Sequence, residues 1–176
     1  MNHDSFLINL MENLGMKYDY ENIVIQSVTN HTWFKVASLH MNGHAIIDIV
    51  TDIDEFTGDS LLKSFIAKSV STKNTQIKMV VDNHLAPYET REFKNFLYVN
   101  CGDNSSLEII ISNKKIKGRY STITDCCGGD NLIFSEKTCG TFTNQETPGF
   151  VSYKERTLID VTRKDFVNMY HSGEKL

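Results

Sequence analysis

The fold expected for this chain depends most on residues 107–134, LEIIISNKKIKGRYSTITDCCGGDNLIF. Short runs rich in isoleucine, threonine and aromatic residues alternate there with turn-forming pairs such as Asn113-Lys114 and Lys117-Gly118. This alternation is typical of short strands joined by tight turns. We therefore predict strands at residues 107–112, 119–123 and 132–134.

The rest of the chain continues the same pattern. Further strands are predicted at residues 23–28, 33–36, 45–50, 76–81, 96–99, 138–142 and 150–153. Helices are predicted near the two ends, at residues 4–14 and 162–170, and at residues 59–66, where apolar residues recur four apart behind Asp59. Many short strands with few helices indicate a mainly β protein, an antiparallel barrel or sandwich.

Length and composition bound the class of protein. The chain has 176 residues, 40% of them hydrophobic, which suits one domain or two small packed barrels and argues against disorder. If there are two barrels, the polar stretch 83–92 is the best boundary, and we predict subdomains at residues 1–85 and 86–176 that form one compact unit.

Charge and cysteine content suggest the partners and the compartment. The 18 basic and 22 acidic residues give a formal charge of −4, so we expect no nucleic acid partner. No apolar run approaches the roughly 20 residues needed to span a bilayer, so no membrane partner is expected either. Four cysteines are too few for a disulfide scaffold, and the predicted location is the cytoplasm.

The chemistry-bearing candidate is the run Asp125-Cys126-Cys127-Gly128-Gly129. A thiol before two glycines suits a nucleophile turn, because glycines let backbone amides converge into an oxyanion pocket near the sulfur. The alternative is a turn cysteine beside a hairpin glycine pair. The sequence has no glycine-rich phosphate loop, HExxH or CxxC pair, so we predict no cofactor and no metal.

A nucleophilic cysteine needs a base and an acid that orients the base. His40 and His44 flank the predicted turn at Asn42-Gly43, and spacing alone does not choose between them. Spacing leaves the acid open as well, among Asp48, Asp52, Asp54, Asp59, Asp82, Glu89 and Glu92.

Several of these segments, taken together, resemble a known family. Residues 34–44, FKVASLHMNGH, resemble the segment around the catalytic histidine of the picornaviral 2A proteases, which are small chymotrypsin-like cysteine proteases. Residues 58–64, GDSLLKS, resemble the segment of their catalytic aspartate, and Cys127-Gly128-Gly129 falls where their nucleophile turn lies. Residues 139–142 and 148–152 resemble the strands of their substrate pocket.

The resemblance implies two antiparallel chymotrypsin-like β-barrels, with His40 as general base, Asp59 as its orienting acid and Cys127 as nucleophile. The oxyanion and substrate pocket would then comprise Cys126, Gly128, Gly129, Gly140, Thr141 and Phe142. The implied substrates are a viral polyprotein and host proteins, in the host cytoplasm.

One departure from the family pattern and one related family bear on this interpretation. Asp125 stands where the family has a glycine, which puts the oxyanion turn in question. The related picornaviral 3C proteases suggest another register, in which Glu89 or Glu92 would be the acid.

We therefore consider two functions. The first is a cysteine endopeptidase that acts by acyl transfer. The alternative is a non-enzymatic acidic cytosolic interaction protein, either an immunity protein or a viral host-factor binder, including a protease-like fold without activity.

Overall fold

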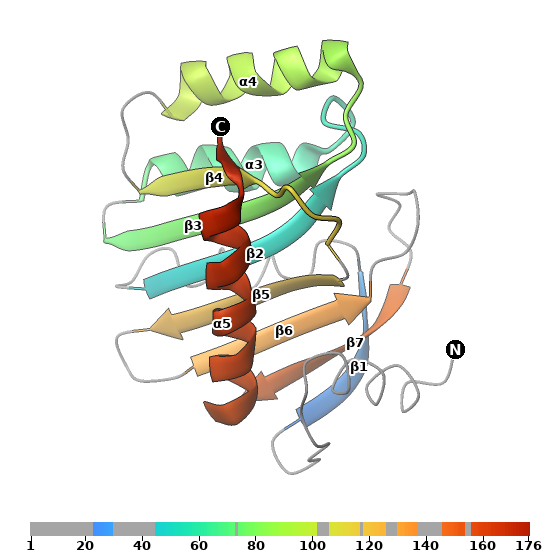
Figure 1. The fold of residues 1–176 in the computed structure, drawn as a ribbon, viewed down its shortest axis with the longest axis vertical. Helices are drawn as coiled ribbons and strands as arrows, with labels where there is room; N and C mark the ends of the chain where they lie inside the picture. Colours follow the sequence, from blue (N-terminus) through green and yellow to red (C-terminus); the bar gives the residue numbers. More distant parts are fainter. Residues whose placement is uncertain are drawn as a thin grey trace.

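The computed structural model describes residues 23–29, 45–72, 74–101, 106–116, 118–125, 130–136, 146–153 and 156–176. These ranges form an open eight-stranded sheet with helices on both faces (Figure 1). The strands are β1 (Ile23–Thr29), β2 (Ala45–Ile53), β3 (Thr75–Asn83), β4 (Leu107–Ile111), β5 (Gly118–Asp125), β6 (Asp130–Glu136), β7 (Glu146–Tyr153) and β8 (Glu174–Lys175). The helices are α3 (Ser60–Val70), α4 (Pro87–Cys101) and α5 (Arg156–Ser172). The strand order is β1-β7-β6-β5-β2-β3-β4-β8.

One half of the sheet is parallel. Strands β2, β3 and β4 run in the same direction, and α3 and α4 make the two crossovers between them. Residues 45–53 and 75–83 are rich in isoleucine and valine, as expected of parallel strands covered on both faces. Ile47, Ile49, Met79 and Val80 are completely buried in these strands.

The other half of the sheet is antiparallel. Strand β5 pairs with β2 on the side away from β3, and β6, β7 and β1 follow in antiparallel order. Strands β5 and β6 follow each other in the chain and pair antiparallel, with residues 126–129 between them. The β2–β5 pairing therefore joins the two halves into one sheet.

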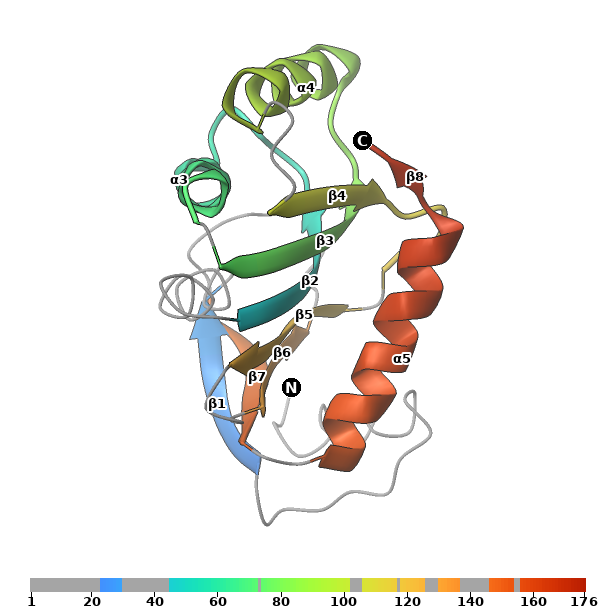
Figure 2. The same ribbon diagram turned by 90° about the vertical axis from the view of Figure 1, so that its left-hand side faces the viewer.

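Helices α3 and α4 cover one face of the sheet and α5 covers the other (Figure 2). The main core lies under α3 and α4, where Phe65 and Ile66 of α3 and Phe93 and Leu97 of α4 join apolar residues of the parallel strands. Phe56, in the loop that precedes α3, packs against Phe93 at a ring-centroid distance of 4.8 Å. Among the described helices, none is both long and apolar enough to cross a membrane.

The end of the chain completes the sheet next to β4. Strand β8 pairs antiparallel with β4, and the Leu176 N–H donates to the Ile109 carbonyl at 3.0 Å. Gly173, between α5 and β8, allows this approach, because a Cβ there would overlap the Ile110 side chain and the Ile111 carbonyl. The tail therefore covers part of an edge strand that would otherwise present unpaired backbone groups.

The prediction of two antiparallel barrels is wrong. The sheet is open and mixed, and strands from both sides of residue 85 lie in it. The error has a physical source: a short apolar run bounded by turns fits either an antiparallel strand or a buried parallel strand. The decisive signal is a helix between two such runs, because a parallel connection requires a crossover.

Some of the individually predicted helices and strands are confirmed by the structure and others are wrong. The helix predicted from residue 59 is confirmed as α3, and the helix predicted at residues 162–170 lies within α5. The strand predicted at residues 96–99 is wrong, because this stretch belongs to α4, in which Phe93 and Leu97 are buried four residues apart on one helix face. Elements predicted at residues 4–14, 33–36 and 138–142 lie outside the described residues.

Candidate functional site

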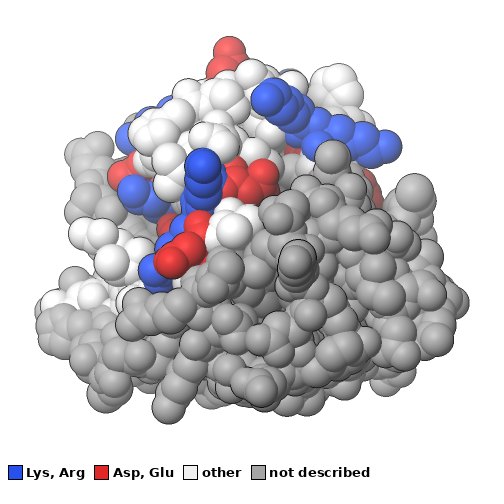
Figure 3. Space-filling model, turned by 60° about the horizontal axis from the view of Figure 1, so that its bottom comes forward, with Lys and Arg blue, Asp and Glu red and all other residues white. Residues whose placement is uncertain are grey.

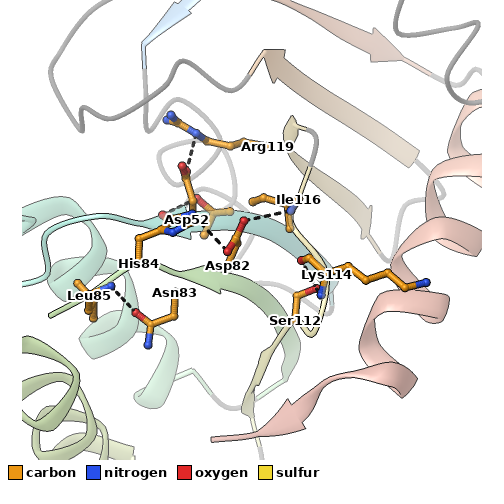
Figure 4. Close-up of polar contacts among 10 residues, drawn as sticks. Asp52, Asp82, Asn83, His84, Leu85, Ser112, Lys114, Ile116 and Arg119 are labelled. Atoms are coloured by element: carbon orange, nitrogen blue, oxygen red, sulfur yellow. Dashed lines mark hydrogen bonds and ion pairs between the residues drawn. The ribbon is translucent and has the colours of Figure 1, made fainter. Parts of the chain in front are cut away.

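The carboxyl ends of β2, β3 and β4 lie together at one edge of the sheet. After β2 the chain adds β3 and β4 on one side, and then returns to place β5 on the other side of β2. In open α/β sheets, ligand sites lie beyond the carboxyl ends of parallel strands, at the point where the strand order reverses. The edge around the end of β2 and the start of β5 is therefore the candidate functional site (Figure 4).

A buried ion pair joins the two strands at this point. The Arg119 Nε lies 2.8 Å from the Asp52 Oδ1, and the two side chains are 1% and 0% exposed. Asp52 is the second-to-last residue of the apolar strand β2, and Arg119 is the second residue of β5. Because both charges are shielded from water, the free-energy cost of burying either one is offset mainly by its attraction to the other.

Beside the ion pair, the end of β3 holds an aspartate and a histidine. The Asp82 Oδ1 lies 3.3 Å from the His84 Nε2, and the Asp82 Oδ2 accepts a hydrogen bond of 3.1 Å from the Ile116 N–H. The backbone N–H of His84 donates to the Ile53 carbonyl at 3.1 Å. Asp82 is mostly buried, whereas 44% of the His84 side chain is exposed.

This arrangement fixes the chemistry that His84 can offer. When the Nε2 of a neutral imidazole carries the proton and donates to a carboxylate, the Nδ1 is left as a base. A carboxylate that holds a histidine in this way also stabilises the imidazolium that forms when the ring takes up a proton. The Asp82–His84 pair is thus an oriented and accessible acid–base group.

The connection between β4 and β5 borders the same edge. It is held by Ser112, whose hydroxyl donates to the Lys114 carbonyl at 2.7 Å and accepts from the Lys114 N–H at 3.1 Å. Lys114 and Lys115 are exposed, and no acidic residue occurs between Ser112 and Arg119. A locally basic connection therefore lies next to the Asp82–His84 pair.

On the part of the described surface that Figure 3 shows, charges of both signs are mixed. Figure 3 views the molecule from below relative to Figure 1, and the Lys and Arg side chains drawn there lie beside Asp and Glu side chains. Within the described part of the chain, no group of three or more His, Cys, Asp or Glu residues is placed to hold a metal ion.

A second polar group lies under α5, on the opposite sheet face from α3. The strand register places Asp48, Lys78 and Glu108 side by side on β2, β3 and β4. Tyr170 of α5 donates a hydrogen bond to Glu108, and the Lys78 ammonium lies 4.9 Å from the centre of the Tyr170 ring. On β5, the Tyr120 hydroxyl donates to the Asp165 carboxylate of α5 at 3.1 Å.

Burial shifts two acidic groups in this cluster. Desolvation raises the pKa of Asp48 from 3.8 to about 6, although the positive charges of Lys78 and Arg163 act in the opposite direction. Burial also raises the pKa of Tyr120 well above 10, and the Asp165 carboxylate that its hydroxyl contacts adds to the rise. Helix α5 therefore packs on a sheet face where the charged forms of Asp48 and Tyr120 are disfavoured.

The acids proposed for a protease triad have structural roles. Asp59 is the N-cap of α3, and its Oδ1 accepts the Leu62 N–H at 2.8 Å. The Glu89 carboxylate accepts the Thr57 hydroxyl at 2.9 Å and ties α4 to the loop before α3, whereas Glu92 is half-buried on α4.

Of the predicted nucleophile turn at residues 125–129, the structure describes Asp125. Asp125 is the last residue of β5 and pairs with Ala45 of β2. The remaining candidates lie outside the described residues: His40, His44, Cys126, Cys127, Gly128, Gly129, Gly140, Thr141 and Phe142.

Sequence reasoning missed Asp52, Asp82 and Arg119 as a group. A signal was present, because the apolar runs of β2 and β3 end in Val-Thr-Asp and Val-Val-Asp, respectively. Aligned acidic residues at the ends of two apolar strands are expected when the strands are parallel and their carboxyl ends meet at one edge. The antiparallel interpretation hid this, because it put the two ends at opposite edges.

Comparisons with known proteins find similar folds among solved structures and no match by sequence. No protein-family model and no curated protein sequence matches the chain. TrmBL2, described as an archaeal chromatin protein with a novel mode of DNA binding, matches at a TM-score of 0.54 and 14% identity. The match covers 98% of this chain, which spans 61% of the TrmBL2 chain.

Two further solved structures have the same fold. The phospholipase D family member Nuc from Salmonella typhimurium matches at a TM-score of 0.55 and 12% identity, over 88% of this chain and 97% of that one. Polyphosphate kinase from Porphyromonas gingivalis matches at a TM-score of 0.57 and 13% identity, over 90% of this chain and 27% of the kinase.

These matches correct the functional predictions. The resemblance to picornaviral proteases is wrong, because the chain folds into an open mixed α/β sheet whose structural matches include a phospholipase D family member and no picornaviral protease is among them. The same matches contradict the predicted viral cysteine protease, its polyprotein substrate and the immunity-protein or host-factor alternative. The exclusion of nucleic acid partners is contradicted too, because a fold neighbour is described as binding DNA. The chain thus has a fold that is shared by enzymes and by a chromatin protein.

Proposed function

We propose that this protein binds nucleic acid through phosphodiester groups at the carboxyl edge of β2, β3 and β4. The observation that carries the proposal is the basic connection between β4 and β5. It contributes the exposed Lys114 and Lys115, with no acid between them, next to the edge at which ligands bind in open α/β sheets.

The net charge of −4 does not conflict with this proposal. Phosphate binding depends on the local field, and salt screens exposed charges over about 8–10 Å near physiological ionic strength. Arg119 is already paired with Asp52 in the interior, so exposed Lys114 and Lys115 are the cations available to phosphates. The DNA binding described for TrmBL2, whose fold covers nearly the whole chain, supports the same class of ligand.

The test compares two double variants that remove the same charge. Lys114→Gln/Lys115→Gln is expected to weaken binding of a fluorescein-labelled DNA duplex, measured by anisotropy, and to reduce the slope of log K against log salt by about 2. The matched control, Lys68→Gln/Lys164→Gln, changes one lysine in the last turn of α3 and one exposed lysine of α5, both away from this edge, and is expected to bind like the parent.

Equal weakening in the two double variants would show that only net charge matters, and would contradict a site at this edge. Absence of duplex and single-strand binding by the parent protein at low salt would reject the proposal altogether.

A second candidate function is hydrolysis of a phosphodiester, which the Asp82–His84 pair favours. The His84 Nδ1 would take a proton from a water molecule as the water oxygen bonds to phosphorus. The bond from phosphorus to the leaving sugar oxygen breaks, and that oxygen receives the proton from the imidazolium. Asp82, held by the Ile116 N–H, would keep the ring oriented throughout. The phospholipase D family match is consistent with this reaction class.

If this reaction occurs, His84→Ala is expected to lower the rate of cleavage of a labelled oligonucleotide by about 100-fold or more, a typical loss for a general base. His171→Ala, which removes an exposed histidine of α5, is the matched control and is expected to keep the parental rate. Binding by the His84 variant should remain, because its imidazole is not one of the proposed phosphate contacts. An unchanged rate in His84→Ala would reject the hydrolytic role and leave the binding proposal standing.

A further inference from the structure

The outer face of α4 carries large side chains that the fold does not use. Tyr98 is 84% exposed, Val99 78% and Tyr88 58%. With 3.6 residues per turn, residues 88, 91, 95, 98 and 99 fall on one side of the helix, opposite the buried Phe93 and Leu97. These exposed residues therefore form one surface, which we call the α4 face: Tyr88, Arg91, Asn95, Tyr98 and Val99, with the exposed Lys94 at its border.

The charge on the α4 face is positive. Arg91 and Lys94 are exposed, and none of the exposed α4 residues is acidic. The two acids of this helix are half-buried: Glu89 accepts hydrogen bonds from Thr57, and Glu92 borders the face. The Arg91 guanidinium lies 5.8 Å from the centre of the Tyr88 ring, so a cation and an aromatic ring are adjacent on this face.

The α4 face continues from the proposed phosphate site. Helix α4 begins at Pro87, three residues after His84, so Tyr88 lies in the first turn next to the carboxyl edge of β3. The hydrogen bonds between Thr57 and Glu89 fix this end of the helix to the loop that follows β2. A strand of nucleic acid bound at the edge would thus meet Tyr88 first and Tyr98 later.

We infer that the α4 face binds single-stranded nucleic acid, with bases stacked on Tyr88 and Tyr98 and phosphates on Arg91 and Lys94. The inference rests on the proposed nucleic-acid function and specifies its ligand. The two tyrosines are ten residues apart, which corresponds to about 15 Å along a helix. At about 3.4 Å per stacked nucleotide, this distance covers roughly four nucleotides. Bases within a duplex are paired and stacked already, so only a single strand can offer their faces to these rings.

The experiment measures the anisotropy of one labelled DNA sequence as a single strand and as a duplex. Tyr88→Ala/Tyr98→Ala is expected to weaken single-strand binding by about tenfold or more and to leave duplex binding within about twofold. Tyr88→Phe/Tyr98→Phe keeps the rings and is expected to bind the single strand like the parent. Val167→Ala, at an exposed apolar position of α5, is the control for general surface effects and is expected to bind both forms like the parent.

The possible results distinguish failure of the α4 inference from failure of the proposed nucleic-acid function. If the alanine variant binds the single strand like the parent while Lys114→Gln/Lys115→Gln binds it weakly, the α4 inference fails and the proposed function stands. Equal loss for single strand and duplex would overturn base stacking. If neither form binds the parent, both proposals fail together. A parental dimer in sedimentation that Tyr98→Ala dissociates would show that a second copy occupies the face, and would overturn the inference.

Discussion

Replacing Arg119 with methionine is expected to lower the free energy of unfolding by about 3–5 kcal/mol, the usual cost of removing one partner from a buried ion pair. The substitution leaves the carboxylate of Asp52, which is 0% exposed, without the guanidinium that lies 2.8 Å away. Methionine matches much of the arginine stem in length and flexibility, so the loss of unfolding free energy comes mainly from removal of the positive charge. Urea unfolding followed by circular dichroism at neutral pH measures it.

Two further variants show whether the ion pair causes this loss. Asp52→Leu/Arg119→Met removes both charges together and should recover most of the lost stability, because apolar replacements of buried pairs are often neutral or stabilising. Lys114→Met removes an exposed cation from the same connection and should change stability by no more than about 0.5 kcal/mol. A loss below about 1 kcal/mol for Arg119→Met would contradict the structural role assigned to the pair.

Asp48→Asn is expected to stabilise the protein near neutral pH, by about 2–3 kcal/mol, since each pKa unit is worth about 1.4 kcal/mol. Burial raises the pKa of Asp48 from 3.8 to about 6 in the folded protein, so its carboxylate form is disfavoured there. The folded state therefore gains stability from this group below about pH 4, and loses that gain as the pH rises through about 6. Asparagine is neutral throughout and avoids the loss.

The measurement is urea unfolding of parent and variant at a series of pH values between about 4 and 8. The stability difference between them should grow from low to neutral pH and level off above the folded-state pKa. Asp160→Asn, at an exposed position of α5, is the control and should give a small difference that stays constant across the series. Parallel curves for the parent and Asp48→Asn would contradict the assigned cause.

Local sequence signals predicted several elements correctly. Asp59 was recognised as a capping residue in front of a run with helical spacing, and it caps α3 through a hydrogen bond to the Leu62 N–H. The strands at residues 45–50, 76–81 and 107–112 were found from their β-branched and apolar composition. Such signals depend on interactions within a few residues, so a single sequence contains them.

The candidate site could not be predicted in the same way. Asp52 and Arg119 are 67 positions apart in sequence, and they meet because β5 returns antiparallel beside β2. Asp82 and Ile116 meet because the β4–β5 connection turns back across the end of β3. A residue pattern that lacks the pairing order cannot distinguish these partners from any other Asp, Arg or His in the chain.

The sequence by itself determined most of the strands and the residue at which α3 begins. Each of these follows from backbone preference, capping or composition over a short stretch. Only the tertiary structure decided that β2, β3 and β4 run parallel, that their carboxyl ends gather Asp52, Asp82, His84 and Arg119, and that the tyrosines of α4 face outward. The physical reason is that strand direction is set by crossover helices packing on the sheet, an interaction between segments distant in sequence.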